Sequence, residues 1–394
     1  MPKFIKKKCF CYWRGLLCYS LIIFHMGCVD PVEPIFENEE GLIYVDAFLS
    51  TTLGSSFVTV SESVLDFDRL RFNFLNDAEV KYRNVETNLE VSLISQENTY
   101  VPPSDFAAEE GSVWELSIFL PDGTEYRSSP ERISEPVAIA DIRATYNPEL
   151  IFRDSKDEFL PGHFISIDLE DPADKDNYYF WRFTSFESLM ICKSCTNGIL
   201  RNGECQENAV FGLDYTADYL CEQDCWQKRY NENIKIFSDE FTNGLQITAL
   251  PVADVLLYSK ENIVVELQQF SLSPEAYEYY KVLKDIVDNN GGLNAPPPAA
   301  LVGNMFNAQD DNEFVLGRFT AAATTTISIF IDREDIEEPP IEVTRPLELE
   351  SCFILCDPAQ CTGEAPPCSV PIVTSTSCSE TRFMTAIEPD AWEE

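Results

Sequence analysis

The sequence predicts a mainly β protein, with an N-terminal β-sandwich, a larger β-rich domain that contains one main helix, and a cysteine-rich C-terminal tail. Three observations support this prediction. Apolar and polar residues alternate in short runs between turn residues, as they do in half-buried strands. One long segment, which begins at Ser273, has helical spacing instead. Ten of the fourteen cysteines fall in two groups, within 192–225 and 352–378.

Residues 1–27 are predicted to be a lipoprotein signal peptide and not part of the fold. A basic stretch precedes an apolar run from Leu16 to Met26, which is too short for a membrane span of roughly 20 residues. Gly27 then precedes Cys28, and lipoprotein signal peptidase cuts between a small residue and a cysteine. His25 and Met26 depart from the usual pattern, so an ordinary signal peptide with a chance cysteine is the alternative. We expect lipidation at Cys28.

Residues 28–41 are expected to form an acidic tether between the lipid and the first strand. In the Bacteroidetes phylum, acidic residues directly after the lipidated cysteine resemble a signal for transfer to the cell surface; a plain linker is the other interpretation. The whole chain carries a formal charge of −39. So acidic a surface repels phosphate groups, which argues against nucleic-acid binding. The expected location is the outer membrane, lipid-anchored and on the cell-surface side.

The range 42–136 is assigned to the β-sandwich. Val80 and Tyr82 alternate with charged residues, and Trp114, Leu116 and Ile118 form a second alternating run. A Pro-Asp-Gly turn at 121–123 then reverses the chain. Such a pattern is typical of an antiparallel sheet with one face in water.

The range 137–336 is assigned to the larger β-rich domain, with strands expected at 164–167, 178–183, 263–267, 314–319 and 327–331. Ser273 can cap the predicted helix, Pro274 suits its first turn, and the Asn-Gly-Gly sequence at 290–292 is expected to end it. An apolar stripe on this helix is interpreted as core packing: Ala276, Tyr279, Tyr280, Leu283, Ile286 and Val287. Residues 337–394 form the cysteine-rich tail.

The ten cysteines beyond the signal peptide are predicted to form disulfides. A zinc site made from the first group is the alternative, because two of its cysteine pairs are closely spaced. Each group holds an odd number of cysteines, so complete oxidation within one chain requires at least one bridge between the groups. The sequence leaves the pairing open. The cysteines are Cys192, Cys195, Cys205, Cys221 and Cys225, then Cys352, Cys356, Cys361, Cys368 and Cys378.

No catalytic residue is assigned. His163 is the only histidine beyond the signal peptide, no nucleophile motif adjoins it, and we expect it on the surface. Carboxylates are abundant, but nothing marks one pair as a glycosidase site. Asp171, Asp174, Asp176 and Asn177 could hold a structural calcium ion, although the spacing is not that of an EF-hand. An acidic turn is the preferred interpretation, and no cofactor or metal is assigned.

Several segments resemble the DUF4249 lipoproteins of Bacteroidetes, a family of unknown biochemical activity. One is Asp171-Pro172 with Asn177-Tyr178-Tyr179-Phe180-Trp181-Arg182, and a stronger one is Gln269-Phe270-Ser271-Leu272-Ser273-Pro274-Glu275-Ala276-Tyr277-Glu278-Tyr279-Tyr280. Further blocks are Gly291-Gly292-Leu293, Pro296-Pro297-Pro298, Val302-Gly303-Asn304-Met305-Phe306-Asn307 and Val315-Leu316-Gly317-Arg318-Phe319. The resemblance covers roughly residues 42–333. It implies an outer-membrane lipoprotein, commonly associated with TonB-dependent β-barrel receptors, and it supplies no catalytic residues.

We therefore expect a non-enzymatic accessory or interaction subunit of an outer-membrane β-barrel complex, active in TonB-dependent uptake or in barrel assembly. The expected contact regions are 296–307 and the cysteine-rich tail, with some aromatic side chains exposed. A lipoprotein that binds a glycan or a protein at the cell surface on its own is the alternative. A carboxylate-dependent hydrolase is a third, weaker candidate.

Overall fold

The computed structural model describes residues 40–66, 69–153, 156–173, 175–189, 191–196, 198–202, 204–207, 217–223, 225–288, 301–341, 378 and 380–393. Within these residues the fold is mainly β, as predicted, with one α-helix, α2 (Pro274–Asp288). None of the described helical segments is both long and apolar enough to span a bilayer.

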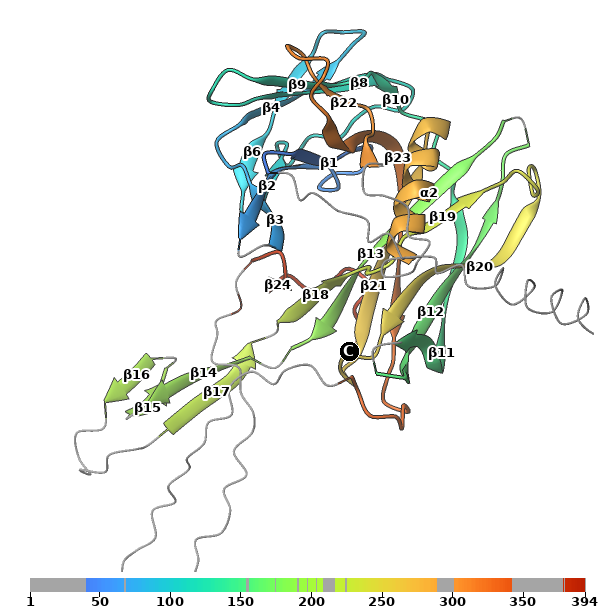
Figure 1. The fold of residues 1–394 in the computed structure, drawn as a ribbon. Helices are drawn as coiled ribbons and strands as arrows, with labels where there is room; N and C mark the ends of the chain where they lie inside the picture. Colours follow the sequence, from blue (N-terminus) through green and yellow to red (C-terminus); the bar gives the residue numbers. More distant parts are fainter. Residues whose placement is uncertain are drawn as a thin grey trace, which may run out of the picture.

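The largest sheet has eleven strands and runs through the whole molecule (Figure 1). Its main path is β24-β18-β13-β21-β23-β1-β2-β7-β6, and β19 and β3 pair with β13 and β2 beside this path. The strands are β1 (Ile43–Ser50), β2 (Phe57–Asp66), β3 (Arg69–Phe74), β6 (Ile94–Gln96), β7 (Thr99–Val101), β13 (Tyr178–Ser188), β18 (Trp226–Tyr230), β19 (Lys235–Ser238), β21 (Ile263–Ser271), β23 (Val315–Ile331) and β24 (Met384–Thr385).

Strand β23 joins the two halves of this sheet, because it pairs with β1 on one side and with β21 on the other. Its first half pairs in parallel with β1, from Val315 opposite Ile43 to Ala322 opposite Ser50. Its second half pairs antiparallel with β21, from Ala323 opposite Ser271 to Ile331 opposite Ile263. The sequence predicted two strands, at 314–319 and 327–331, whereas the structure has one strand of 17 residues. The intervening Ala and Thr residues carry no apolar alternation. Those from Thr320 to Thr324 are buried where the two halves meet, whereas Thr325 is half-buried and Thr326 is exposed.

A close approach fixes glycine at one position of β23. Gly317 has a φ of +92°, and a Cβ atom placed there would lie 1.9 Å from the carbonyl oxygen of Val45. The left-handed backbone is accessible to glycine at little cost, whereas other residues are strained there. Gly317 therefore permits the parallel contact between β23 and β1.

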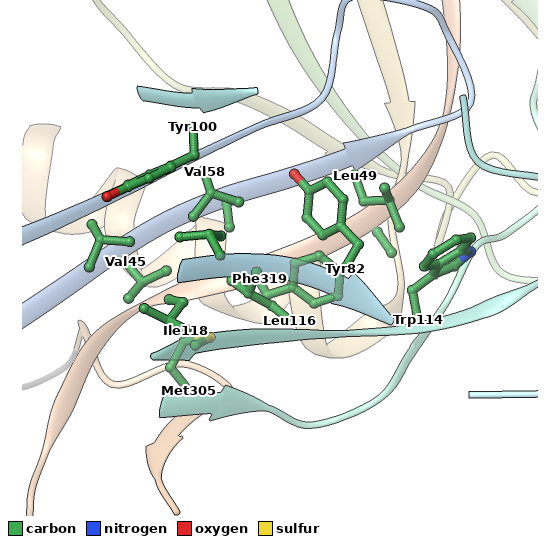
Figure 2. Close-up of a cluster of buried hydrophobic side chains, with 14 of the residues drawn as sticks. Val45, Leu49, Val58, Tyr82, Tyr100, Trp114, Leu116, Ile118, Met305 and Phe319 are labelled. Carbon is green, nitrogen blue, oxygen red and sulfur yellow. The ribbon is translucent and has the colours of Figure 1, made fainter. Parts of the chain in front are cut away.

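The first core lies between this sheet and a six-stranded sheet of order β22-β9-β8-β4-β5, with β10 on β8. Figure 2 shows its side chains pointing toward one another from the two layers. The Tyr82 hydroxyl crosses the core and donates a hydrogen bond to the carbonyl oxygen of Phe48 (2.8 Å). The strands of the second sheet are β4 (Glu79–Asn84), β5 (Glu90–Ser92), β8 (Val113–Phe119), β9 (Glu125–Ser128), β10 (Glu131–Arg132) and β22 (Met305–Asn307).

The sandwich is therefore built from both ends of the described chain. The apolar residues predicted for the core in 80–82 and 114–118 are buried. The wet face predicted for the second run is wrong, because Glu115 and Ser117 are buried as well. Two strands from beyond residue 300 complete the structure: β23 pairs with β1, and β22 pairs with β9. Neither pairing could be predicted from the sequence pattern.

The second core lies between the other half of the large sheet and a three-stranded sheet of order β11-β12-β20. Alternate residues of β13, among them Tyr179, Trp181 and Phe183, point into it. The opposite residues of the same strand point toward α2. The three strands are β11 (Ile139–Arg153), β12 (Glu158–Glu170) and β20 (Gln246–Leu256). Two further hairpins pair β14 (Ile191–Thr196) with β17 (Ala217–Gln223), and β15 (Gly198–Arg201) with β16 (Glu204–Glu207).

Helix α2 covers a third apolar cluster, on the face of the large sheet opposite both cores. The predicted cap is confirmed, because the Ser273 hydroxyl accepts a hydrogen bond from the Ala276 amide (3.1 Å). Ala276, Tyr279 and Tyr280 are buried as expected. Val287, expected in the core, is exposed instead, since the last turn extends beyond the sheet. The Asn-Gly-Gly segment lies outside the described residues.

Candidate functional site

A recess of about 130 Å³ opens between α2 and the large sheet. Its lining combines charged and aromatic side chains: Tyr44, Asp46, Phe180, Arg182, Tyr279 and Arg318. The local alternation of the strands explains this lining. In β1, the residues on either side of Asp46 enter the first core, and in β13, those on either side of Arg182 enter the second core. The two charged residues therefore face the third side.

Arg182 lies over an aromatic floor. Its guanidinium carbon is 3.9 Å from the centre of the Phe48 ring, 5.1 Å from Phe57 and 5.2 Å from Phe180. Such cation–π contacts contribute up to about 2 kcal/mol each when the cation is desolvated. The closest carboxylate oxygen, Oδ1 of Asp46, is 3.9 Å from a guanidinium nitrogen, which is beyond hydrogen-bond distance. Only 22% of the Arg182 side chain is exposed.

Asp46 lies in the wall of the recess, and 37% of its side chain is exposed where the recess opens. Burial raises the pKa of Asp46 above its ordinary value, and the positive charges of Arg182 and Arg382 partly oppose that rise. Burial also raises the pKa of the neighbouring Tyr44 and Tyr279 hydroxyls, so both remain protonated donors. The recess thus holds an ionisable acceptor among several donors.

Arg318 is held differently, by a buried ion pair. Its guanidinium donates to Oε2 of Glu131 (2.7 Å), and Ser273 and Asn304 donate to the same carboxylate (2.8 and 3.1 Å). Burial raises the pKa of Glu131, with Arg318 acting in the opposite direction. These bonds connect β10, β23, the start of α2 and the chain before β22. They fix one wall of the recess, because Arg318 has little freedom to turn away.

Sequence reasoning missed this site. The available signal was a single charged residue inside each of two apolar strand segments, Asp46 within 43–49 and Arg182 within 178–183. Charged residues are rarely buried unless they are paired or functional. Nothing in the sequence alone brings the two together, because their strands meet only through the folding of the large sheet.

A known protein family matches the part of the chain that forms most of these strands. A family model described as a domain of unknown function, DUF4249, matches residues 29–328, which is more than half of the chain. The chain belongs to this family. No curated protein and no solved structure matches the chain.

The segments that carry the resemblance to DUF4249 also build the recess. The block at 177–182 supplies Phe180 and Arg182, the block at 269–280 supplies Tyr279, and the block at 315–319 supplies Arg318. The DUF4249 match ends at residue 328, within β23. The cysteine-rich tail lies beyond it.

The expectation that His163 lies on the surface is wrong. His163 lies in β12, the central strand of the three-stranded sheet, and only 4% of it is exposed. Its ring packs edge-on against Tyr146, and its Nδ1 atom has no partner among the described residues. Burial, together with the charge of Arg333, lowers the pKa of His163 to about 4. His163 is in a different layer from the recess and contributes nothing to it.

The acidic segment considered for calcium forms internal hydrogen bonds instead. Asp171 accepts from the Tyr179 hydroxyl (2.5 Å) and from the Gly244 amide (3.1 Å). Asn177 donates to Asp239 (3.0 Å). Asp174 lies outside the described residues, and Asp176 is in none of these bonds. Among the residues that the structure describes, no group of three or more His, Cys, Asp or Glu side chains could hold a metal ion.

One bridge joins the two cysteine groups, as complete oxidation would require. Cys225 and Cys378 form a disulfide across 153 residues of sequence. Beside it, β24 pairs with β18, and Trp392 contacts Trp226 and Phe330. The end of the tail is therefore fastened to the large sheet. The side chains of the other eight predicted disulfide cysteines, and Cys28, lie outside the described part of the chain.

Proposed function

We propose that this chain is a non-enzymatic, lipid-anchored outer-membrane protein that acts as an accessory subunit of a β-barrel complex. The barrel would be a TonB-dependent receptor or a component of barrel assembly. The observation that carries the proposal is a rigid segment, 301–314, that presents large apolar side chains to solvent. Phe306 is 43% exposed and Phe314 is 70% exposed.

Hydrogen bonds hold this segment against the six-stranded sheet, which supports a role in binding. Glu313 accepts hydrogen bonds from Asn307 and from the Tyr126 hydroxyl, the latter at 2.7 Å. Gln309 is bonded to the Gly123 carbonyl (3.0 Å) and to the Glu125 amide (2.9 Å). A surface that is already ordered loses little conformational entropy on binding. Aromatic side chains on such a surface are frequent sources of binding energy.

The position of β22 adds a second means of contact. Among the described strands β22 is the last of its sheet, because it pairs with β9 on one side only. An outer strand can add a strand from a partner through backbone hydrogen bonds. The segment also overlaps the region 296–307 that the sequence indicated as a contact region.

The proposed lipid at Cys28 would keep this surface close to its partner. Residues 29–42 separate Cys28 from β1, and even a fully extended chain of that length spans at most about 50 Å. The folded part would therefore remain within reach of the extracytoplasmic loops of a barrel. The charge of −39 disfavours direct contact with anionic head groups, which leaves a protein partner as the better candidate.

The test is affinity purification from outer membranes solubilised in mild detergent, followed by mass spectrometry. A barrel protein should co-elute with the wild-type chain and not with the Phe306→Ser/Phe314→Ser double variant. Phe241→Ser is the matched control, because Phe241 is 87% exposed but follows β19. Elution of the wild-type chain alone, at low salt and after crosslinking, would refute the complex. Equal recovery with the double variant would place the contact elsewhere.

A further inference from the structure

The recess contains polar groups with unused hydrogen-bonding capacity. Among the described residues, neither the Arg182 guanidinium nor the Asp46 carboxylate makes a hydrogen bond, and their mutual distance is 3.9 Å. The hydroxyls of Tyr44 and Tyr279 line the same cavity and likewise have no partner there. The side chains of Arg182 and Asp46 are 22% and 37% exposed in the recess, so their polar atoms can be reached by a ligand, which would replace water as their hydrogen-bond partner.

The volume limits the size of the occupant. The recess measures about 130 Å³. At roughly 30 Å³ per water molecule it holds the equivalent of about four waters, whereas sites for drug-sized ligands exceed about 300 Å³. A nucleotide or a flavin is too large. The edge of one ring with its hydroxyl groups, or one short side chain, fits, with the remainder of the ligand outside.

The charges limit its chemistry. An anion would be attracted by Arg182 but repelled by Asp46 and by the strongly negative protein. The charge of Arg318, which also lines the recess, is already paired with Glu131. A cation would meet the fields of Arg182 and Arg382, both of which act on Asp46. A neutral group that both donates and accepts hydrogen bonds meets no such opposition. Vicinal hydroxyls have this property, because one can donate to Asp46 while its neighbour accepts from Arg182.

The aromatic side chains fit the same occupant. Tyr44 lines the recess, and the half-exposed Phe72 packs against it with ring centres 5.7 Å apart. Ligand pockets combine aromatic side chains with a few polar groups that fix the orientation of the ligand. A sugar ring matches this combination, because it has apolar C–H faces and hydroxyl groups at its edge. Phe180 and Tyr280 close the inner wall, stacked with ring centres 4.7 Å apart. We propose that the recess binds one neutral sugar residue of a glycan, between Asp46, Arg182 and Tyr44.

This inference goes beyond the accessory role and does not depend on a barrel partner. It is tested with the purified full chain in detergent, by saturation-transfer NMR and calorimetry. The probes are glucose, galactose, mannose and N-acetylglucosamine, each with its linear oligosaccharides. At least one probe should bind, and Asp46→Asn and Arg182→Gln should each weaken that binding roughly tenfold to hundredfold. Phe152→Ser, an exposed residue of β11 in a different layer from the recess, should leave the affinity unchanged.

Structural damage is separated from loss of contact by two measurements. Asp46→Asn is nearly isosteric, so its thermal midpoint and near-ultraviolet circular dichroism should match those of the wild-type chain. Tyr44→Phe removes only one hydroxyl and should also lower the affinity. Absence of binding for every neutral probe at about 10 mM would overturn the proposal. So would binding that both Asp46 and Arg182 variants retain, or a preference for acetate, phosphate or a cationic amine over the neutral probes.

Discussion

His163 should make the folded protein less stable as the pH falls below neutrality. In the fold its pKa is lowered to about 4 from an ordinary value of 6.5, because it is buried in β12 and lies near the positive Arg333. The unfolded chain therefore binds a proton below pH 6.5 that the folded chain takes up only near pH 4. Stability contributed by the neutral ring is complete above pH 6.5 and is lost progressively as the pH falls to about 4.

The loss of stability at a given pH follows from the distance of that pH below the unfolded pKa of 6.5. One pKa unit corresponds to about 1.4 kcal/mol, so at pH 5, about one and a half units below the unfolded value, the loss is about 2 kcal/mol. Carboxylates also titrate in this range, so the wild-type curve alone does not isolate the histidine. His163→Leu does isolate it, because leucine can fill the apolar site and cannot be protonated.

The assay is urea unfolding of both proteins at pH 7 and at pH 5, followed by circular dichroism. The difference in unfolding free energy between His163→Leu and the wild-type chain should become about 2 kcal/mol more favourable to the variant at pH 5. Titration of the histidine by NMR should give a pKa well below 6 in the folded chain. Parallel pH profiles for the two proteins, or a histidine that titrates near 6.5, would refute the assignment of a buried neutral ring.

Three further changes test other parts of the structure. Cys378→Ser removes the bridge to Cys225. Because the bridge closes a long loop, its loss should lower the free energy of unfolding by up to about 5 kcal/mol, measured by urea titration under non-reducing conditions. An unchanged midpoint would show that the bridge does not stabilise the fold. Gly317→Ala should cost about 3 kcal/mol or more, from the strained φ and the contact with β1, and a loss below 1 kcal/mol would contradict the close approach. Glu187→Ala leaves the fully buried Arg333 without its carboxylate partner (3.2 Å) and should lower the free energy of unfolding by about 3–5 kcal/mol. Asp66→Ala breaks an exposed pair with Arg71 and should lower it by less than about 1 kcal/mol. Equal effects of these last two substitutions would contradict the importance of burial.

Local chemistry made several elements predictable. The helix was found from Ser273, Pro274 and the spacing of its tyrosines, because these signals act within one or two turns. The turn at 121–123 was found for the same reason, and Gly123 has the positive φ (93°) that such a turn uses. Alternation identified β4 and β8, since the apolar residues on one face of each strand enter the first core.

The features that were missed depend on distant parts of the chain. His163 was expected outside because its own sequence neighbourhood is a turn-like Pro-Gly, whereas β11 and β20 cover β12 on both sides. The recess depends on Asp46 and Arg182, which are separated by more than 130 residues in the sequence but lie 3.9 Å apart in the fold, with Arg182 over the Phe48 ring. Each of these charges by itself is compatible with an ordinary strand. Only the tertiary arrangement gives them a shared environment.

The parallel pairing of β1 with β23 has a consequence for the order in which the protein can be made. A chain that leaves the ribosome from its N-terminus releases β1 first, and its neighbour β23 follows about 270 residues later. Until residue 322 has emerged, one edge of β1 has no partner, and the core that it shares with β4 and β8 stays open. Closing so long a loop is slow compared with forming a hairpin. The first strand to be made is thus among the last to be completed, and the edge of β1 stays unpaired until β23 is available.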